Sequence, residues 1–172
     1  KQIKDYQSAL ASQASAGNTS FVYDGGSFLW PVPSSQRITA GYQSNDSVHK
    51  GRHNGIDIGA SNGAPIIAIS DGVVVKSNNS CTHNYGKSGS CGCGGGYGNY
   101  VTINHGTKDG KTYVVTYGHM SSTAVSTGAT IKKGQVIGYV GSTGWSTGFH
   151  LHFGMAVNGA WVNPMNYYRK VG

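Results

Sequence analysis

Short apolar segments separated by glycine, asparagine and serine run through the chain from Phe21 onward. Segments of about four to eight apolar or alternating residues, bounded by such turn formers, are typical of β-strands. The segments that we predict to be strands are 66–69, 73–75, 100–104, 113–117, 136–140 and 151–157. The connections between them are too short for parallel crossovers, and Asp109-Gly110 is a hairpin turn signal. We therefore predict a mostly β protein with a compact antiparallel core.

Residues 1–16 follow a different pattern. Ile3, Tyr6, Leu10 and Ala14 recur at spacings of three and four, and a glycine follows at position 17, where a helix cap belongs. This pattern predicts a short amphipathic helix, either the end of a longer stalk or part of the fold. We divide the chain into this N-terminal segment, 1–20, and a domain at 21–172.

Composition narrows the function classes. A length of 172 residues suits one domain, and the formal charge of +7 makes an anionic cell-wall polymer or a nucleic acid a plausible neighbour. The basic residues are scattered rather than arranged in a nucleic-acid-binding motif, so we expect no nucleic-acid partner. No apolar run approaches the roughly 20 residues of a membrane span. The chain opens on Lys1, and we expect a targeting segment upstream.

Residues 77–99 interrupt the strand pattern with a stretch rich in Gly, Ser and Asn that contains all three cysteines. A loop of this length in a compact domain is usually functional or disordered. An odd number of cysteines allows at most one internal disulfide, and we expect Cys81 to pair with Cys91 or Cys93. The alternative is a closed zinc site made by these cysteines and His83.

Two short motifs carry candidate metal ligands. In FHLHF, His150 and His152 stand two apart on a predicted strand and so share a face. In RHNGIDIG, Asn54-Gly55 predicts a turn, with His53 arriving from it and Asp57 from the following strand. Either motif alone is common among ordinary histidines and carboxylates.

Together the motifs supply imidazoles and a carboxylate. A catalytic zinc site takes three nitrogen or oxygen ligands from the protein and leaves the fourth position for water. A structural zinc more often has four ligands, frequently cysteines, and calcium and magnesium prefer oxygen ligands alone. The residue types therefore favour a catalytic zinc, although they do not say which histidine of the HLH pair binds it.

The remaining histidines divide into one candidate and three background residues. His119 ends the predicted strand in YVVTYGHM, and a hydrolase needs groups beside the metal to move protons and to stabilise an oxyanion. No glutamate lies in these motifs, so spare histidines are the available groups. We expect His105 to be structural and His49 and His83 to be solvated loop residues.

The ordered set of motifs resembles the lysostaphin and LytM type of zinc metallopeptidases. The resemblance covers about residues 38–168. It includes HNGIDIGASNGAPIIAISDGVV, GNYVTINHG, YGHM, IKKGQVIGYVGSTG, STGFHLHF and WVNPMNY. The order of HxxxD, YxH and HxH, with the Gly-rich GxVIGYVGSTG before the last motif, makes it specific.

The resemblance implies a zinc-dependent endopeptidase that hydrolyses peptide bonds in bacterial peptidoglycan, in a narrow groove on a β core. Carried over residue by residue, His53, Asp57 and His152 are the implied zinc ligands. His119 and His150 are the implied catalytic pair, with the general base not assigned to either. The implied protein is an exported, wall-associated monomer. The bond that it hydrolyses could lie in a stem-peptide cross-link, a direct bridge or a polyglycine bridge.

Two departures from the family pattern and one rival function accompany this prediction. Phe149 stands where a proline is common, and the 77–99 loop is longer and contains cysteines. Tyr97 and Trp145 are candidate contacts for a peptide along that loop. The alternative function is a non-catalytic wall-binding or hydrolase-activating domain, because some family members have lost their ligands.

Overall fold

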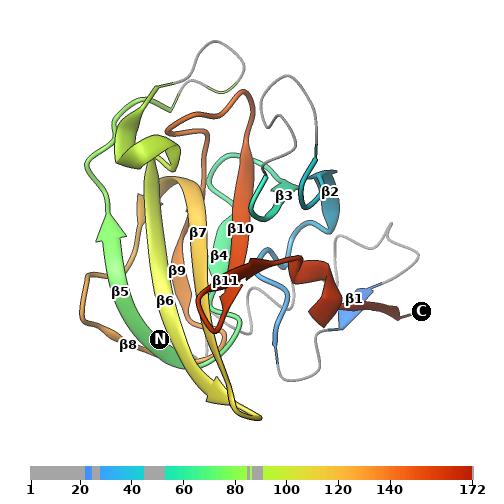
Figure 1. The fold of residues 1–172 in the computed structure, drawn as a ribbon. Helices are drawn as coiled ribbons and strands as arrows, with labels where there is room; N and C mark the ends of the chain where they lie inside the picture. The colour runs from blue at the N-terminus through green and yellow to red at the C-terminus, as the bar shows by residue number, and fades with distance from the viewer. Residues whose placement is uncertain (1–21, 25–27, 45–52, 85, 87–90, 172) are drawn as a thin grey trace.

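A computed structural model describes residues 22–24, 28–44, 53–84, 86 and 91–171, and most of its regular structure is β-strand (Figure 1). Ten strands of this part form one antiparallel sheet, with the order β2-β3-β10-β7-β6-β5-β8 along its main path. The predicted mostly β, antiparallel fold is confirmed. The predicted N-terminal helix lies outside the described residues, and the division at residue 20 stays a prediction.

Four long strands make the middle of the sheet. They are β5 (Gly72–Asn78), β6 (Asn99–Lys108), β7 (Lys111–Thr123) and β10 (His150–Val157). Shorter strands extend it: β2 (Arg37–Ala40), β3 (Ile56–Gly59), β4 (Pro65–Ile67), β8 (Thr130–Ile131), β9 (Val136–Val140) and β11 (Ala160–Val162). The predicted strand segments overlap β4, β5, β6, β7, β9 and β10, whereas β2, β8 and β11 were not predicted.

Outside this sheet, β1 (Val22–Asp24) pairs with β12 (Arg169–Val171) near the ends of the described chain. The 3-10 helices η2 (Cys93–Gly96) and η3 (Pro164–Tyr167) also lie within the described residues. No helix within the described residues is long and apolar enough to cross a membrane.

The hairpin between β6 and β7 forms as the turn signal predicts. Asp109 and Gly110 both have positive φ, at 52° and 77°. Two consecutive residues with positive φ suit the turn type whose twist matches paired strands, and Asp-Gly is among the best sequences for it. This turn sets the pairing next to it, with Lys108 opposite Lys111, and a shift of register between Asn104 and Thr107 follows further along the two strands.

Strand β7 joins the two parts of the sheet. Its first part pairs with β10 on one side and β6 on the other. Its last part pairs instead with β9, with Met120 opposite Val140 and Thr123 opposite Gly138. The change of partner occurs next to residues 118 and 119, so the sheet bends where His119 is placed.

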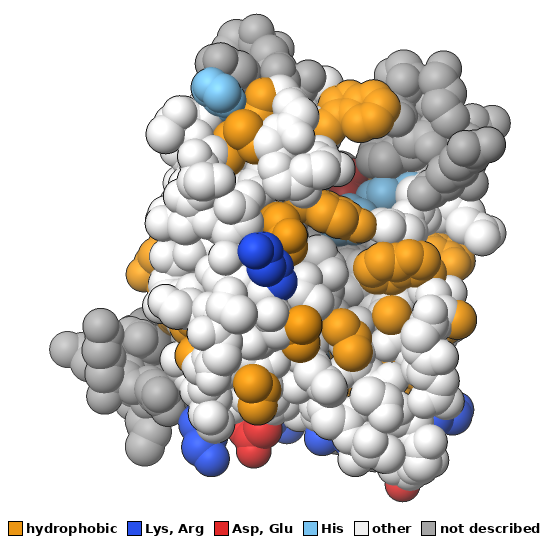
Figure 2. All heavy atoms as spheres, turned by 60° about the vertical axis from the view of Figure 1, so that its left-hand side comes forward, with side chains coloured by type: hydrophobic (Ala, Val, Ile, Leu, Met, Phe, Trp, Pro, Cys, Tyr) orange, Lys and Arg blue, Asp and Glu red, His pale blue; other side chains and the backbone are white. Residues whose placement is uncertain are grey.

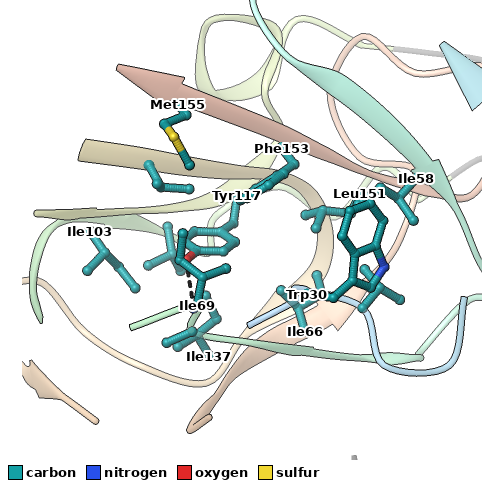
Figure 3. Close-up of a cluster of buried hydrophobic side chains, with 14 of the residues drawn as sticks. Trp30, Ile58, Ile66, Ile69, Ile103, Tyr117, Ile137, Leu151, Phe153 and Met155 are labelled. Carbon is teal, nitrogen blue, oxygen red and sulfur yellow. Dashed lines mark hydrogen bonds between the residues drawn. The ribbon is translucent and has the colours of Figure 1, made fainter. Parts of the chain in front are cut away.

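The hydrophobic core lies on the face of the sheet shown in Figure 3. Tyr117 of β7 and Phe153 of β10 are fully buried there with Leu151 of β10 and with Ile side chains from β3, β4, β6 and β9. The Tyr117 hydroxyl accepts a hydrogen bond from the Ile69 backbone N–H at 3.2 Å. Phe28, Trp30 and Val32 also belong to this core, although they precede the family-like region that starts near residue 38.

Candidate metal centre and active site

Strand β10 places His150 and His152 at the functional site. His152 is opposite Asp57 of β3 on one side and opposite Gly118 of β7 on the other. Leu151, between the two histidines, is fully buried in the core. The alternation of a β-strand therefore sends both imidazoles to the opposite face, as predicted from the HLH spacing.

The turn before β3 brings His53 beside Asp57. Strand β3 begins at Ile56, and all four of its residues are buried. Gly55 packs directly against β10, since a Cβ atom there would lie 2.4 Å from the Phe153 carbonyl oxygen. Glycine is thus required by the close approach of two backbones, and that approach holds the turn with His53 over the end of the sheet.

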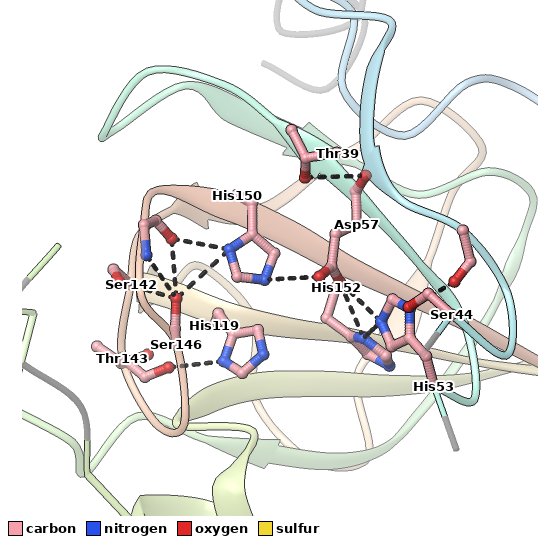
Figure 4. A network of polar contacts seen from close by, with 12 residues as sticks. Thr39, Ser44, His53, Asp57, His119, Ser142, Thr143, Ser146, His150 and His152 are labelled. Carbon is pink, nitrogen blue, oxygen red and sulfur yellow. Dashed lines mark hydrogen bonds and ion pairs between the residues drawn. The ribbon is translucent and has the colours of Figure 1, made fainter. Parts of the chain in front are cut away.

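Three donor atoms converge at the centre of the site (Figure 4). His53 Nε2 lies 2.9 Å from Asp57 Oδ1 and 3.2 Å from His152 Nδ1, and the last two atoms are 3.3 Å apart. Zinc bonds of 2.0–2.1 Å in a tetrahedron place their ligand atoms about 3.3 Å from one another. All three side chains are buried, so the described residues hold a compact set of ligands of the size zinc requires.

The tautomer of His53 indicates whether a cation can lie between His53 and Asp57. Its Nδ1 lies 2.8 Å from the Gly41 carbonyl oxygen, which can only accept, so Nδ1–H donates. In this tautomer Nε2 turns its lone pair toward the Asp57 carboxylate. Two electron-rich atoms at that distance are stabilised by a cation between them. The donor set therefore fits a metal ion, and the carbonyl orients the ligand as outer partners commonly do.

His119 lies at an irregularity in β7. Between Tyr117 and Met120 this strand has one more residue than β6 has between Val101 and Asn99, which is a β-bulge. His119 itself has φ of 61°, uncommon for a residue with a side chain. Its backbone N–H donates to the Tyr97 carbonyl at 2.7 Å. The bulge and this bond aim the ring toward the candidate ligand cluster, at 5.9 Å between the His119 and His152 ring centres.

His119 and His150 present matching atoms to the site. His119 Nδ1–H donates to the Thr143 carbonyl at 2.7 Å, and His150 Nδ1–H donates to the Gly148 carbonyl at 2.7 Å. In the tautomer with the proton on Nδ1, each ring keeps the lone pair of Nε2 for another partner. The two ring centres are 4.8 Å apart, and His150 Nε2 lies 3.5 Å from Asp57 Oδ2. This geometry suits a pair that exchanges protons beside a metal.

Burial sets the electrostatics of the site. Desolvation lowers the pKa of His119 well below its usual range, and the neighbouring His150 and His152 lower it further. Desolvation likewise lowers the pKa of His152. Both rings are thus neutral at neutral pH, the form in which an imidazole binds a metal or accepts a proton.

The 77–99 loop reaches the site through Tyr97. The Tyr97 ring centre lies 5.4 Å from that of His152, and its hydroxyl accepts a hydrogen bond from the Asn54 side-chain amide at 2.9 Å. Sequence reasoning proposed Tyr97 as a substrate contact, whereas in the structure it packs on a member of the ligand cluster. Asn54 was seen only as a turn former, and nothing in its spacing indicates this bond.

Histidines expected to be background divide three ways. His105 is buried, donates from Nδ1 to the Asp71 carbonyl at 3.0 Å and accepts from the Tyr117 hydroxyl at 2.8 Å, so its structural role is confirmed. His49 lies outside the described residues. His83 is exposed, but its Nδ1 is 3.4 Å from Cys93 Sγ, so it is not simply solvated.

The expected disulfide does not form in the structure. Cys81, Cys91 and Cys93 are free, and Cys81 Sγ lies 3.5 Å from Cys91 Sγ, beyond the length of a disulfide bond. The expected pairing was wrong, and the loop instead brings all three thiols and the His83 imidazole to one place, the grouping given as the alternative.

The site opens to the surface in a hollow. Figure 2 shows histidine and acidic side chains at its bottom and hydrophobic side chains around it. A second open hollow beside the loop is lined by Cys91, Gly92, Gly95, Gly96 and Trp145. The Trp145 side chain is 61% exposed, an unusual exposure for a large aromatic residue and typical of binding surfaces.

Comparison with known proteins agrees with the geometry. Residues 51–164, more than half of the chain, match Peptidase family M23. Peptidoglycan DD-endopeptidase ShyA of Vibrio cholerae is 36% identical over 79% of this chain and 28% of its own length. DD-carboxypeptidase/endopeptidase Mpg of Neisseria meningitidis is 38% identical over 73% of this chain and 25% of its own length. The chain thus spans about a quarter of these two relatives.

Solved structures extend the likeness to the fold. A zinc-containing peptidase from Vibrio cholerae superposes with a TM-score of 0.59 at 32% identity, covering 77% of this chain and 37% of its own. The catalytic domain of lysostaphin from Staphylococcus simulans superposes with a TM-score of 0.53 at 34% identity, covering 71% and 80%.

Proposed function

The chain belongs to peptidase family M23, and from that membership we propose that it is a zinc-dependent endopeptidase that hydrolyses peptide bonds in bacterial peptidoglycan. The observation that carries the proposal is the convergence of two imidazole nitrogens and a carboxylate oxygen within 2.9–3.3 Å of one another. Two further histidines lie beside them with their Nε2 atoms available. Relatives named as peptidoglycan endopeptidases support the substrate class.

The ligands that we propose for zinc are His53 through Nε2, Asp57 through Oδ1 and His152 through Nδ1. Three protein ligands leave a fourth position open, which distinguishes a catalytic from a structural zinc site. Zinc held there supplies Lewis-acid activation of water and of the scissile carbonyl. Asp57 also faces His150 with its second oxygen, so one carboxylate links the ligand set to the proton-moving pair.

The proposed task of His119 and His150 is proton transfer and charge stabilisation. One ring accepts a proton from the attacking water at Nε2. The other, protonated at Nε2, donates a hydrogen bond to the oxyanion or returns a proton to the leaving amine. The carbonyls of Thr143 and Gly148 hold both rings in the required tautomer, and the burial of His119 keeps it neutral and ready to accept.

The surroundings of the site support a peptide substrate within the cell wall. Trp145 and Phe149 are exposed on segments next to the HLH motif, where they can pack against an extended peptide. A net charge of +7 favours association with anionic wall polymers. The proposed protein acts as a monomer outside the cytoplasmic membrane.

Hydrolysis of purified cell walls tests the proposal. We expect the wild-type chain to release peptide fragments, a chelator to abolish the release and added zinc to restore it. The D57A variant should be inactive with or without zinc. Binding to walls without any release, by a zinc-loaded chain, would instead support a wall-binding or hydrolase-activating domain.

Defined peptides then identify the bond. A DD-cross-linked stem-peptide dimer and a glycine-bridged dimer, incubated separately and examined by mass spectrometry, distinguish the bond classes by the fragments released. The names of the two relatives make the DD-cross-linked dimer the first choice.

A further inference from the structure

A second group of potential metal ligands lies in the loop between β5 and β6. Cys81 and Cys91 have their Sγ atoms 3.5 Å apart, and Cys93 Sγ is 3.4 Å from His83 Nδ1. One donor atom from each of the four residues lies within 4.8 Å of the other three. None of these residues belongs to the His53, Asp57 and His152 cluster.

The size of this group matches a tetrahedral zinc site. Zinc–sulfur bonds of about 2.3 Å and zinc–nitrogen bonds of about 2.0 Å place sulfurs about 3.8 Å apart and sulfur and nitrogen about 3.5 Å apart. The two shortest separations in the loop, 3.5 and 3.4 Å, are close to these values. A disulfide would need only two of the cysteines and would leave the third thiol and the imidazole unexplained.

The backbone around the donors is anchored to the rest of the fold. Cys81 is buried, its N–H donates to the Asn99 side-chain oxygen at 2.8 Å, and its carbonyl accepts from the Asn99 amide at 2.8 Å. Cys91 N–H donates to the Gly144 carbonyl at 2.9 Å. The Cys93 carbonyl accepts from Gly98 N–H at 2.9 Å. The thiols are thus brought together by bonds that do not themselves involve sulfur.

We propose that Cys81, His83, Cys91 and Cys93 bind a second zinc ion in a closed, structural site. Four protein ligands leave no open position for water or substrate, which is the arrangement of structural zinc. Thiolate ligands select zinc over magnesium and calcium. The spacing, one residue between the ligands of each pair and seven residues between the pairs, lets a single ion close the loop upon itself.

The proposed ion would support the wall of the catalytic site. Just after Cys93, Gly96 accepts the Trp145 N–H at 2.7 Å, and Tyr97 accepts the His119 N–H at 2.7 Å while its ring packs on His152. Ordering the loop therefore fixes the backbone that holds His119 in its bulge. The two sites share no ligand but are coupled through Tyr97.

Zinc counting tests the proposal. The 172-residue chain is prepared with excess zinc and a non-chelating reductant, passed through a desalting column, and its metal is measured by mass spectrometry. We expect two zinc ions in the wild-type chain, one in D57A, one in the double variant C91S/C93S and none in the triple variant. The matched control is T82A, because Thr82 is exposed between two proposed ligands; it should keep both ions.

Cobalt distinguishes the two sites by colour. Cobalt bound to thiolates absorbs strongly in the near ultraviolet by charge transfer from sulfur, whereas cobalt bound to two imidazoles and a carboxylate does not. D57A loaded with cobalt should keep this absorption and C91S/C93S should lose it. The D57A measurement decides the matter even if the double variant does not fold.

Three outcomes would overturn the proposal. The first is a D57A chain without zinc and without the sulfur-to-cobalt absorption. The second is a C91S/C93S chain that folds and still holds two ions. The third is a wild-type chain prepared without reductant in which only one thiol can be titrated after denaturation in chelator, which would indicate a disulfide. Each leaves the proposed peptidase function intact, because that function fails only if D57A loses no zinc or if the wild-type chain releases no fragments.

Discussion

His152 lies directly opposite Asp57 in the antiparallel pair of β10 and β3, and their Nδ1 and Oδ1 atoms are 3.3 Å apart. Side chains at directly opposed positions project from the same face of a sheet. Two members of the proposed ligand set are therefore positioned by backbone hydrogen bonds between strands, and only His53 depends on a turn. A site built on strands in this way is pre-organised before any ion binds.

Removing a proposed ligand should remove the metal. We expect H53A, D57A and H152A each to lower zinc affinity at this site by more than about 100-fold, the upper range for changes merely around a ligand. Wall hydrolysis should disappear with the metal. Metal content after dialysis against a weak chelator measures the loss of zinc. In separate samples loaded with cobalt, the sulfur-to-cobalt absorption of the proposed loop site shows that each variant is still folded. A D57A chain that retains peptidase activity would contradict the ligand assignment.

Removing a proposed proton carrier should separate activity from metal binding. We expect H119A and H150A to retain zinc but to lose about 10²- to 10⁴-fold in kcat. The measurements are zinc content and the rate of cleavage of a defined cross-linked peptide. H105A is a poor control because it is buried, so the control is T82A, because Thr82 is exposed and belongs to neither proposed zinc site. Equal losses of zinc in H119A and D57A would show that His119 is a ligand instead.

Adding one methyl group at Gly55 should damage the site from a distance. A Cβ atom there meets the Phe153 carbonyl oxygen at 2.4 Å, so β3 and β10 must separate. We expect G55A to lower the free energy of unfolding by about 1–3 kcal/mol and to weaken zinc binding, because His53 and His152 move apart. G41A serves as control, since a Cβ there has nothing within 4 Å. Denaturant unfolding and zinc titration measure both effects; equal behaviour of the two variants would argue against the close approach.

The ring of Tyr97, rather than its hydroxyl, should matter for catalysis. The ring packs on His152, whereas the hydroxyl makes the bond from Asn54. We expect Y97A to lower kcat by about 10-fold, in the range seen for outer partners of a metal site, and Y97F to lower it far less. Steady-state kinetics on a cross-linked peptide compare the two. A change confined to KM in both variants would indicate that Tyr97 contacts substrate instead.

His105 should make the fold sensitive to acid. Burial lowers its pKa from 6.5 to about 4 in the folded chain. Between these two pH values the unfolded chain binds the proton and the folded chain does not, so stability is complete above pH 6.5 and falls as the pH drops toward 4. The difference corresponds to about 3 kcal/mol at most.

The H105Q variant isolates this contribution. We expect its free energy of unfolding to be lower than that of the wild type at pH 7 and to fall less steeply between pH 6.5 and 4. Urea unfolding at a series of pH values measures both slopes. His119 and His152 titrate with the same sign in both proteins and cancel in the comparison. Parallel slopes would show that His105 is not the group responsible.

Local patterns predicted most of the fold. The long strands carry continuous apolar or alternating residues, and Asp109-Gly110 marks its turn by chemistry that acts over two residues. Strands β2 and β8 were missed because their residues, RITA and TI, are too few for a periodic signal and become strands only by pairing with β3 and β5. Pairing with a neighbouring strand, rather than local sequence preference, determines that such short segments are strands.

The same division holds for the site. All five side chains that the sequence singled out lie together. Strand alternation and the spacing of motifs predict where side chains point, so these positions could be found from the sequence. The carbonyls of Gly41, Thr143 and Gly148, which fix the tautomers of three of these rings, have no sequence signature, since every residue has a carbonyl. The bulge that turns His119 inward depends on unequal lengths of β6 and β7, which only the paired register reveals.

The loop between Asn78 and Asn99 also offers a route to new specificities. Its two ends are paired to each other across β5 and β6, whereas the proposed catalytic zinc ligands all lie outside it. A loop whose ends are held by neighbouring strands, and which contains none of the proposed catalytic ligands, can be exchanged between homologous enzymes without changing the strand pairing of the sheet. We expect chimaeras that keep the Tyr97 carbonyl in place to retain the proposed chemistry, so this loop is a practical starting point for directed evolution.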